Sequence, residues 1–172
     1  MRKVEIRNKI FEMLKEISES KSHSGLLIIY SDLLNVLRRG AYPLGEKKEF
    51  KEFDEIAHIN SKNAREILKK IGEDGAILID KKGYIYSPAV YLNVNLFSID
   101  EEKIEPDFGA RHIAALATSS TTKASVYTLS EETGKVREFI KGKIKRRYPT
   151  KQQEKIIEII KKDLKSANKI KE

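Results

Sequence analysis

Asp74-Gly75-Ala76-Ile77-Leu78-Ile79-Asp80 is the stretch of this 172-residue sequence that decides the fold. Its continuous apolar centre, bounded by acidic residues, is typical of a strand that is buried on both faces of a sheet. Gly83 then supplies a turn, and Tyr84-Ile85-Tyr86 completes a predicted β-hairpin. A second continuous apolar run, Gly25–Tyr30, predicts another buried strand.

Helical and strand-like patterns alternate on either side of this hairpin, which predicts an α/β fold. Apolar residues at helical spacing predict a helix over Lys3–Ser18, and Asn60 or Ser61 caps another helix that continues through Ile71. The other elements expected are a short helix that begins after Ser31 or Asp32 and ends at Gly40, a loop-rich stretch over Ala41–His58, strands over Tyr91–Phe97, Ala124–Leu129 and Val136–Ile140, and a small helix from about Arg111 to Ala117.

The positive charge of the chain is concentrated at its C-terminal end. The net charge is +8, and residues 137–172 hold 13 Lys or Arg against 5 Asp or Glu, which by itself gives +8. The residues before them hold 21 of each sign. A nucleic-acid-binding domain carries its basic excess on the folded body, so this distribution argues against nucleic acid as a partner of the body.

The C-terminal segment has two distinct parts. Lys141–Arg147 packs five basic residues into seven positions, and we interpret it as a solvated basic connector, with a surface for acidic partners or nucleic acid as the alternative. Thr150 and Gln153 form a candidate capping box for a last helix. We therefore divide the chain into a domain over residues 1–145 and a basic helical extension over residues 146–172. The apolar face of this helix must pack on the body or on another protomer, and it consists of Ile156, Ile157, Ile159, Ile160 and Leu164.

The composition excludes several classes of protein. The chain has no cysteine, which excludes disulfides, a thiolate nucleophile and cysteine-ligated zinc. Leu26–Tyr30 is far shorter than the roughly 20 apolar residues of a membrane helix, and the first twenty residues lack the hydrophobic region of a signal peptide. We therefore expect a cytoplasmic protein with no membrane partner. The glycine-rich phosphate-binding patterns of the common NTPase and dinucleotide-binding folds are also missing from the sequence.

Three short motifs carry groups suited to a nucleoside triphosphate. In Asp74-Gly75-Ala76 the glycine lets a ribose approach the backbone, and the aspartate can bind a divalent metal and accept a hydroxyl proton. In Gly109-Ala110-Arg111-His112 the last two residues stand at the start of a helix, where free N–H groups favour anions. In Ser130-Glu131-Glu132-Thr133-Gly134 the serine offers a hydroxyl to phosphate, and either glutamate offers hard oxygen to a metal.

In this order the three motifs resemble those of the diadenylate cyclase domain family, in its soluble, archaeal-like members. Family members carry an Asp-Gly-Ala motif on a strand, an Arg-His-Arg motif that opens a helix, and a Ser-Glu-Glu-Thr-Gly turn. The likeness spans roughly residues 26–140 and includes the hairpin at Gly83 and the segment Val90-Tyr91-Leu92. The resemblance implies a central mixed β-sheet flanked by helices on both faces. It also implies that two ATP molecules are condensed into cyclic di-AMP and two pyrophosphates between two facing protomers, with Mg²⁺ or Mn²⁺.

The resemblance also implies that the protein is a homo-oligomer that binds ATP, and it implies roles for individual residues of the site. The catalytic residues would be Asp74, Arg111 and His112. The metal ligands would be Asp74, Glu131 and Glu132. The residues that contact the substrate would be Gly75, Ala76, Leu92, Gly109, Ala110, Arg111, His112 and Ser130.

Two positions depart from the family pattern. Ala110 stands where the family has Thr, and Ile113 stands where the family has the second Arg of Arg-His-Arg. The loss of a cation from a phosphate clamp weakens transition-state stabilisation, as it does in other phosphoryl-transfer sites. Three explanations are open: the second Arg is dispensable, another cation such as Lys123 replaces it, or the domain is a catalytically silent module that binds ATP or cyclic di-AMP. The intact first and third motifs favour activity.

Overall fold

The computed structural model describes residues 2–20, 23–43, 53–73 and 75–169. The strands in these ranges are β1 (Leu26–Tyr30), β2 (Ala41–Pro43), β3 (Asp54–His58), β4 (Ala76–Ile79), β5 (Tyr84–Leu92), β6 (Ser125–Leu129), β7 (Val136–Ile140) and β8 (Lys143–Tyr148). The α-helices are α1 (Lys3–Ser18), α2 (Leu33–Arg38), α3 (Ala64–Ile71), α4 (Ala110–Thr121) and α5 (Lys151–Lys169). Two short 3₁₀ helices, η2 (Leu96–Ser98) and η3 (Glu101–Lys103), connect β5 to α4.

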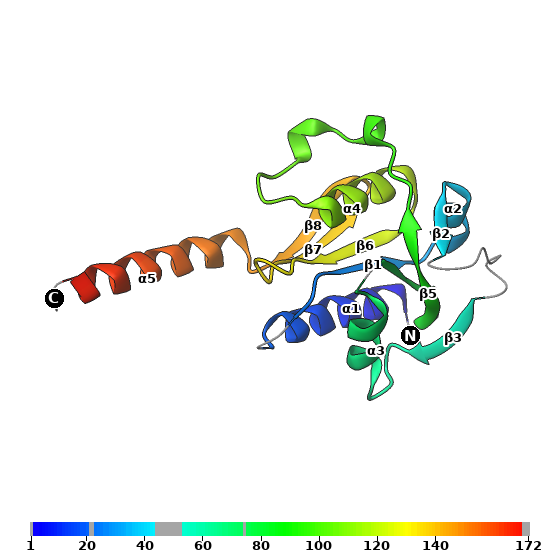
Figure 1. The fold of residues 1–172 in the computed structure, drawn as a ribbon, viewed down its shortest axis with the longest axis horizontal. Coiled ribbons are helices and arrows are strands. Elements are labelled where there is room, and N and C mark those ends of the chain that lie inside the picture. The colour runs from blue at the N-terminus through cyan, green and yellow to red at the C-terminus, as the bar shows by residue number, and fades with distance from the viewer. Residues whose placement is uncertain (1, 21–22, 44–52, 74, 170–172) are drawn as a thin grey trace.

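The strands form one mixed sheet. Their order is β2-β5-β4-β1-β6-β7-β8, and β3 also pairs with β5. β1 and β4 run parallel at the centre of the sheet, and each of the other pairings is antiparallel. Figure 1 shows α1 and α3 on one face of the sheet and α4 on the other. The predicted α/β fold, with a central mixed sheet flanked by helices on both faces, is confirmed.

The side chains of β1 alternate between two hydrophobic cores. Leu26, Ile28 and Tyr30 belong to the core that also contains buried side chains of α1 and α3. Leu27 and Ile29 belong to the core that contains buried side chains of α2 and α4. Every residue of β1 is buried, which is why its sequence is continuously apolar rather than alternating.

Two expectations for the edge of the sheet are wrong. The stretch Ala41–His58, expected to be rich in loops, contains the strands β2 and β3 in its described part, and both pair with β5. The separate strand expected over Tyr91–Phe97 does not form, because β5 continues from the hairpin to Leu92 and η2 follows. Pairing with distant segments provides the hydrogen bonds of these strands, and local sequence patterns do not reveal such pairing.

The basic stretch Lys141–Arg147 is not a solvated connector. Lys141 and Gly142 have φ values of 51° and 65° and form a tight turn, after which β8 pairs with β7. Arg146 Nε donates to Glu138 Oε2 at 2.6 Å, and Arg147 Nη2 donates to Glu105 Oε1 at 2.7 Å. The basic side chains of this strand are therefore partly neutralised by carboxylates of the body.

The predicted capping box of the last helix is confirmed. The N–H of Thr150 donates to Gln153 Oε1 at 2.8 Å, and the N–H of Gln153 donates to Thr150 Oγ1 at 3.2 Å. Because β8 continues to Tyr148, the boundary expected between residues 145 and 146 falls inside a strand, and the helical extension begins at Lys151. α5 extends away from the body as a single helix (Figure 1). Within the described ranges, no helix has the length and apolar character needed to cross a bilayer.

Candidate active site

The strand pairing brings the sequence motifs to one edge of the sheet. Ala76 at the start of β4 is opposite Leu27 of β1, and Leu26 of β1 is opposite Leu129 at the end of β6. Gly75 and Ser130 therefore flank the same edge, next to the first turn of α4. Asp74, predicted to be catalytic and to bind metal, lies outside the described residues.

Two adjoining cavities occupy this edge. The larger has a volume of about 460 Å³ and is lined by Gly75, Ala76 and Leu92, among others. The smaller has a volume of about 230 Å³, and its lining includes Gly109, His112, Ser130, Glu131 and Glu132. Ala110 and Arg111 line both cavities. The structure thus brings together all the predicted site residues that it describes, and the larger volume is in the range of ordinary small-molecule sites.

Arg111 is positioned between the two cavities. Its Nη2 donates to the backbone oxygen of Glu73 at 2.9 Å, and this bond uses one of the five N–H donors of the guanidinium. Gly25 makes this position available, because a Cβ on Gly25 would stand 2.6 Å from Arg111 Nη1. The guanidinium is therefore held at the backbone that leads into Asp74, with donors left for phosphate oxygens.

His112 lines the smaller cavity but is largely buried against the protein. Its side chain stacks on Phe108 with ring centroids 5.0 Å apart, and the residue is 4% exposed. The N–H of Gly109 points to Nδ1 at 3.2 Å, and Arg137 Nη1 lies 2.9 Å from Nε2. Both neighbours are donors, so both oppose a protonated ring. Burial and the charge of Arg137 lower the pKa of His112 to about 4, which leaves it neutral near pH 7.

The catalytic role expected for His112 stays a prediction. A neutral imidazole whose two nitrogens face Gly109 and Arg137 adds no positive charge to a phosphate clamp. Its contact with the N–H of Gly109 lies at the start of α4, the turn that carries Arg111.

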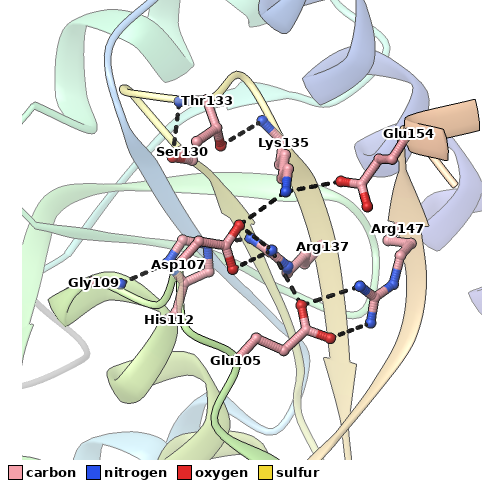
Figure 2. Close-up of polar contacts among 10 residues, drawn as sticks. All are labelled: Glu105, Asp107, Gly109, His112, Ser130, Thr133, Lys135, Arg137, Arg147 and Glu154. Carbon is pink, nitrogen blue, oxygen red and sulfur yellow. Dashed lines mark hydrogen bonds and ion pairs between the residues drawn. The ribbon is translucent and has the colours of Figure 1, made fainter. Parts of the chain in front are cut away.

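Arg137 is the centre of a polar network behind His112, which is drawn in Figure 2. Its Nη2 donates to both carboxylate oxygens of Asp107, at 2.8 and 2.7 Å, and to Glu105 at 3.2 Å. Lys135 bridges Asp107 at 3.0 Å and Glu154 of α5 at 2.8 Å. Burial alone would raise the pKa of Asp107, but hydrogen bonds from Arg137 and Lys135 outweigh it and lower that pKa to about 2. The network keeps Asp107 ionised and joins α4, β7 and α5.

The third motif forms the turn between β6 and β7. The N–H of Gly134 donates to the backbone oxygen of Ser130 at 2.9 Å, and Gly134 has a φ of 66°, which favours glycine. The N–H of Thr133 donates to Ser130 Oγ at 3.3 Å, so the serine keeps its own O–H donor for a ligand. The carboxylates of Glu131 and Glu132 are on exposed residues that line the smaller cavity.

The described residues supply part of a metal site. Among them no cluster of three or more His, Asp or Glu side chains is arranged to hold an ion. Mg²⁺ commonly takes one or two carboxylates and completes its shell with substrate phosphates and water. The hard oxygens of Glu131 and Glu132 fit that requirement.

Lys123 does not replace the missing arginine. Its backbone N–H donates to Asp32 Oδ2 at 2.7 Å, just after the end of β1. The cavities lie at the beginning of β1, so Lys123 is at the opposite end of the central strands. Ile113 is half-buried on α4, and the described lining of the two cavities does not include it.

Sequence analysis missed four residues that shape the site. Gly25 is the first residue of a predicted buried strand, and a glycine there is a signal for close approach of another group. Glu73 contributes only a backbone oxygen, which no side-chain pattern reveals. Arg137 and Asp107 belong to no motif, and their pairing across 30 positions becomes visible only in the folded chain.

Comparisons with known proteins identify the family of this chain. The family model described as "DisA bacterial checkpoint controller nucleotide-binding" (DAC) matches residues 14–144. The diadenylate cyclase of Haloferax volcanii is 30% identical over 141 residues, which are 78% of this chain and 49% of that protein. The diadenylate cyclase of Methanocaldococcus jannaschii is 34% identical over 89 residues, 51% of this chain and 28% of that protein. The chain spans less than half the length of these two relatives.

Solved structures share the fold. A double mutant of DacA from Staphylococcus aureus superposes with a TM-score of 0.55 at 21% identity, covering 89% of this chain and 92% of that chain. A hypothetical membrane spanning protein from Bacillus cereus gives a TM-score of 0.51 at 24% identity, covering 80% of this chain and 61% of that chain. At these identities the likeness concerns the fold alone. The family model, in contrast, covers most of the sequence, and this chain therefore belongs to the diadenylate cyclase family of nucleotide-binding domains.

Proposed function

We propose that this chain is a diadenylate cyclase that condenses two ATP molecules into cyclic di-AMP. The observation that carries the proposal is the shared border of the two cavities. Arg111 lines both, between a glycine-containing strand start on one side and the Ser130–Gly134 turn on the other. If the nucleoside lies in the larger cavity and the triphosphate in the smaller one, each motif contacts a different part of the same ligand.

The reaction forms a phosphodiester bond twice. In each step the 3′-hydroxyl of one ATP attacks the α-phosphorus of the other, the hydroxyl proton leaves to a base, and pyrophosphate departs. Asp74 is the residue we assign to that proton. A free aspartate has a pKa of about 3.9 and is a weak base for an alcohol, so the hydroxyl needs further activation.

The other residues bind and orient the nucleotide. Gly75 and Ala76 leave room for the ribose next to the backbone, and Leu92 borders the base. The Arg111 guanidinium and the Ser130 hydroxyl donate to phosphate oxygens, with the N–H groups at the start of α4. A divalent ion, Mg²⁺ or Mn²⁺, would be held by Asp74 with Glu131 or Glu132, and when bound it would lower the pKa of the hydroxyl and neutralise phosphate charge.

The reaction requires two protomers in this proposal. Each protomer binds one ATP, and the two sites face each other so that each hydroxyl meets the other α-phosphate. Specific activity should therefore rise with protein concentration in the dilute range and level off once dimers dominate. A constant specific activity down to nanomolar protein would contradict a dimeric site with micromolar association.

Chromatography of products after incubation with ATP and Mg²⁺ or Mn²⁺ tests the chemistry. We expect cyclic di-AMP and pyrophosphate from the natural sequence and none from Asp74→Asn, which should still bind ATP. Lys123→Ala, a change at the opposite end of the central strands, is the matched control and should keep full turnover. Turnover by Asp74→Asn equal to the natural sequence would remove Asp74 from its role.

A second function is favoured by Ala110 and Ile113. Without the family's threonine and second arginine, the cavities could bind ATP or cyclic di-AMP without turning ATP over. This module would show saturable nucleotide binding by calorimetry and no product with either metal. Nucleic-acid binding has less support, because Arg146 and Arg147 are paired with Glu138 and Glu105.

A further inference from the structure

α5 presents an apolar face that the body does not cover. The side chains of Ile156, Ile157, Ile159, Ile160 and Leu164 are 41–60% exposed. We expected this face to pack on the body or on another protomer. α5 points away from the sheet (Figure 1), so these side chains do not pack on the body. With a turn of 3.6 residues the five side chains span roughly 160° of the helix surface, and the position of Asp163 falls within that arc. A face this wide needs a partner, because a lone helix gains little stability in water.

The start of α5 is firmly attached to the body. Besides the capping box, Glu154 pairs with Lys135 at 2.8 Å, and Tyr148 just before the helix donates to Glu19 of the body at 2.6 Å. Lys135 also holds Asp107, so the first turn is tied to the polar network behind the site. The helix is therefore presented from a fixed base.

We propose that α5 is a self-association helix, whose apolar face pairs antiparallel with α5 of a second copy of this chain. The seam would consist of Ile157, Ile160 and Leu164, whose spacing of three and then four residues is that of the a and d positions of a coiled coil. This surface is separate from the cavity edge, so the inference does not rest on the proposed function.

Charge complementarity supports a second copy in this orientation. Glu154 and Lys161 are seven residues apart and lie on the same flank of the seam. Antiparallel pairing sets Glu154 of one copy, whose Oε1 already pairs with Lys135 of its own body, beside Lys161 of the second copy, twice in each pair. Parallel pairing lacks this match and brings the two bodies to the same end of the helices, whereas antiparallel pairing sends them to opposite ends.

The same residues argue against a membrane surface as the occupant. α5 has no Trp, Tyr or Phe to anchor at the lipid headgroups. Its six lysines are offset by three carboxylates, which halves the charge that anionic lipid would attract. A second copy satisfies both the apolar face and the mixed charges.

Sedimentation equilibrium of the full chain tests the proposal. We expect Ile157→Glu with Ile160→Glu to lower the weight-average mass at least two-fold at micromolar protein. Lys165→Glu, which introduces the same residue on the opposite side of α5, should leave the mass unchanged. An unchanged mass in the double variant would overturn the proposal, and so would co-sedimentation of the natural chain with phosphatidylserine vesicles that the double variant abolishes.

Cross-linking tests the orientation. Because the chain contains no cysteine, single-cysteine variants give unambiguous disulfides. Glu154→Cys mixed with Lys161→Cys should form a cross-linked dimer on mild oxidation, and Lys161→Cys alone should form several-fold less. Equal cross-linking of Lys161→Cys alone would overturn the antiparallel register. ATP affinity of the double glutamate variant, measured in parallel, should stay within two-fold of the natural value and so separates this test from that of the proposed function.

Discussion

Arg137 Nη1 lies 2.9 Å from His112 Nε2, and the two residues join the sheet to the start of α4 at the candidate site. Arg137 is 1% exposed and His112 is 4% exposed, so their contact is shielded from water. The guanidinium is balanced by Asp107 and Glu105, and the imidazole stays neutral. A buried charge thus holds the helix that carries Arg111, without itself reaching the cavities.

Replacing Arg137 should destabilise the fold strongly. Arg137→Met removes the buried one of the two cations that pair with Asp107 and leaves the carboxylate with Lys135 alone, and the loss of a buried ionic partner costs about 3 kcal/mol in comparable pairs. Arg147→Met is the matched control, because Arg147 pairs with Glu105 from a more exposed position, and we expect a loss of about 1 kcal/mol or less. Urea unfolding at pH 7 measures both, and equal losses would contradict the central role of Arg137.

Stability should fall as the pH drops from about 6.5 to about 4. The unfolded chain protonates His112 near its ordinary pKa of 6.5, whereas burial and Arg137 lower the folded pKa to about 4. The contribution of His112 to the free energy of unfolding is therefore fully present above pH 6.5. As the pH falls, protons bind the unfolded chain and not the folded one, and this contribution is lost. The full loss is on the order of 3 kcal/mol, at up to about 1.4 kcal/mol per pH unit.

His112→Asn tests this pH dependence. The variant should be less stable at pH 7 but should lose less stability between pH 6.5 and pH 4.5 than the natural sequence. Urea unfolding at several pH values gives both curves. Asp107, whose pKa is lowered to about 2, affects stability only below about pH 3.8, outside this window. Parallel curves for the two proteins would mean that His112 is not the titrating group.

The buried strands could be predicted from the sequence, and the edges of the sheet could not. β1 and β4 are apolar at every position because both faces are covered, so composition alone identifies them. Four of the six residues of β8 are basic, and the strand depends on carboxylates of other elements, Glu138 on β7 and Glu105 before α4. The cavity residues followed from motifs, but the burial of His112 depends on Phe108 and Arg137 packing around it, and no motif records that packing.

Restoring the family's threonine should strengthen ATP binding. Ala110 lines both cavities, so Ala110→Thr places a hydroxyl where phosphates are expected. One added hydrogen bond is worth about 1 kcal/mol, or about five-fold in the dissociation constant measured by calorimetry. Ile113→Arg changes a residue outside the described cavity lining and should alter the affinity less than two-fold. A larger gain from Ile113→Arg would show that the arginine side chain reaches the ligand and that its loss matters.

Gly25→Ala should weaken nucleotide binding through Arg111. The added Cβ would stand 2.6 Å from Arg111 Nη1, so the guanidinium must shift, and we expect it to lose its bond to the backbone oxygen of Glu73. Hydrogen bonds to a charged group are worth about 1.5–3 kcal/mol, and the ATP dissociation constant should rise about ten-fold or more. The displaced atoms are the end of a flexible side chain, so the free energy of unfolding should change by less than about 1 kcal/mol.

A double-mutant cycle distinguishes displacement of Arg111 from general damage at Gly25. If Gly25→Ala acts only through Arg111, then adding it to Arg111→Ala should cause no further loss of ATP affinity. Gly72→Ala provides the contrast, because its Cβ would meet the backbone oxygen of Leu68 at 2.8 Å and the side chain of Leu26 in the core. That change should lower the unfolding free energy by about 1–3 kcal/mol. Additive losses in the cycle would mean that Gly25 contributes to the site by a route other than Arg111.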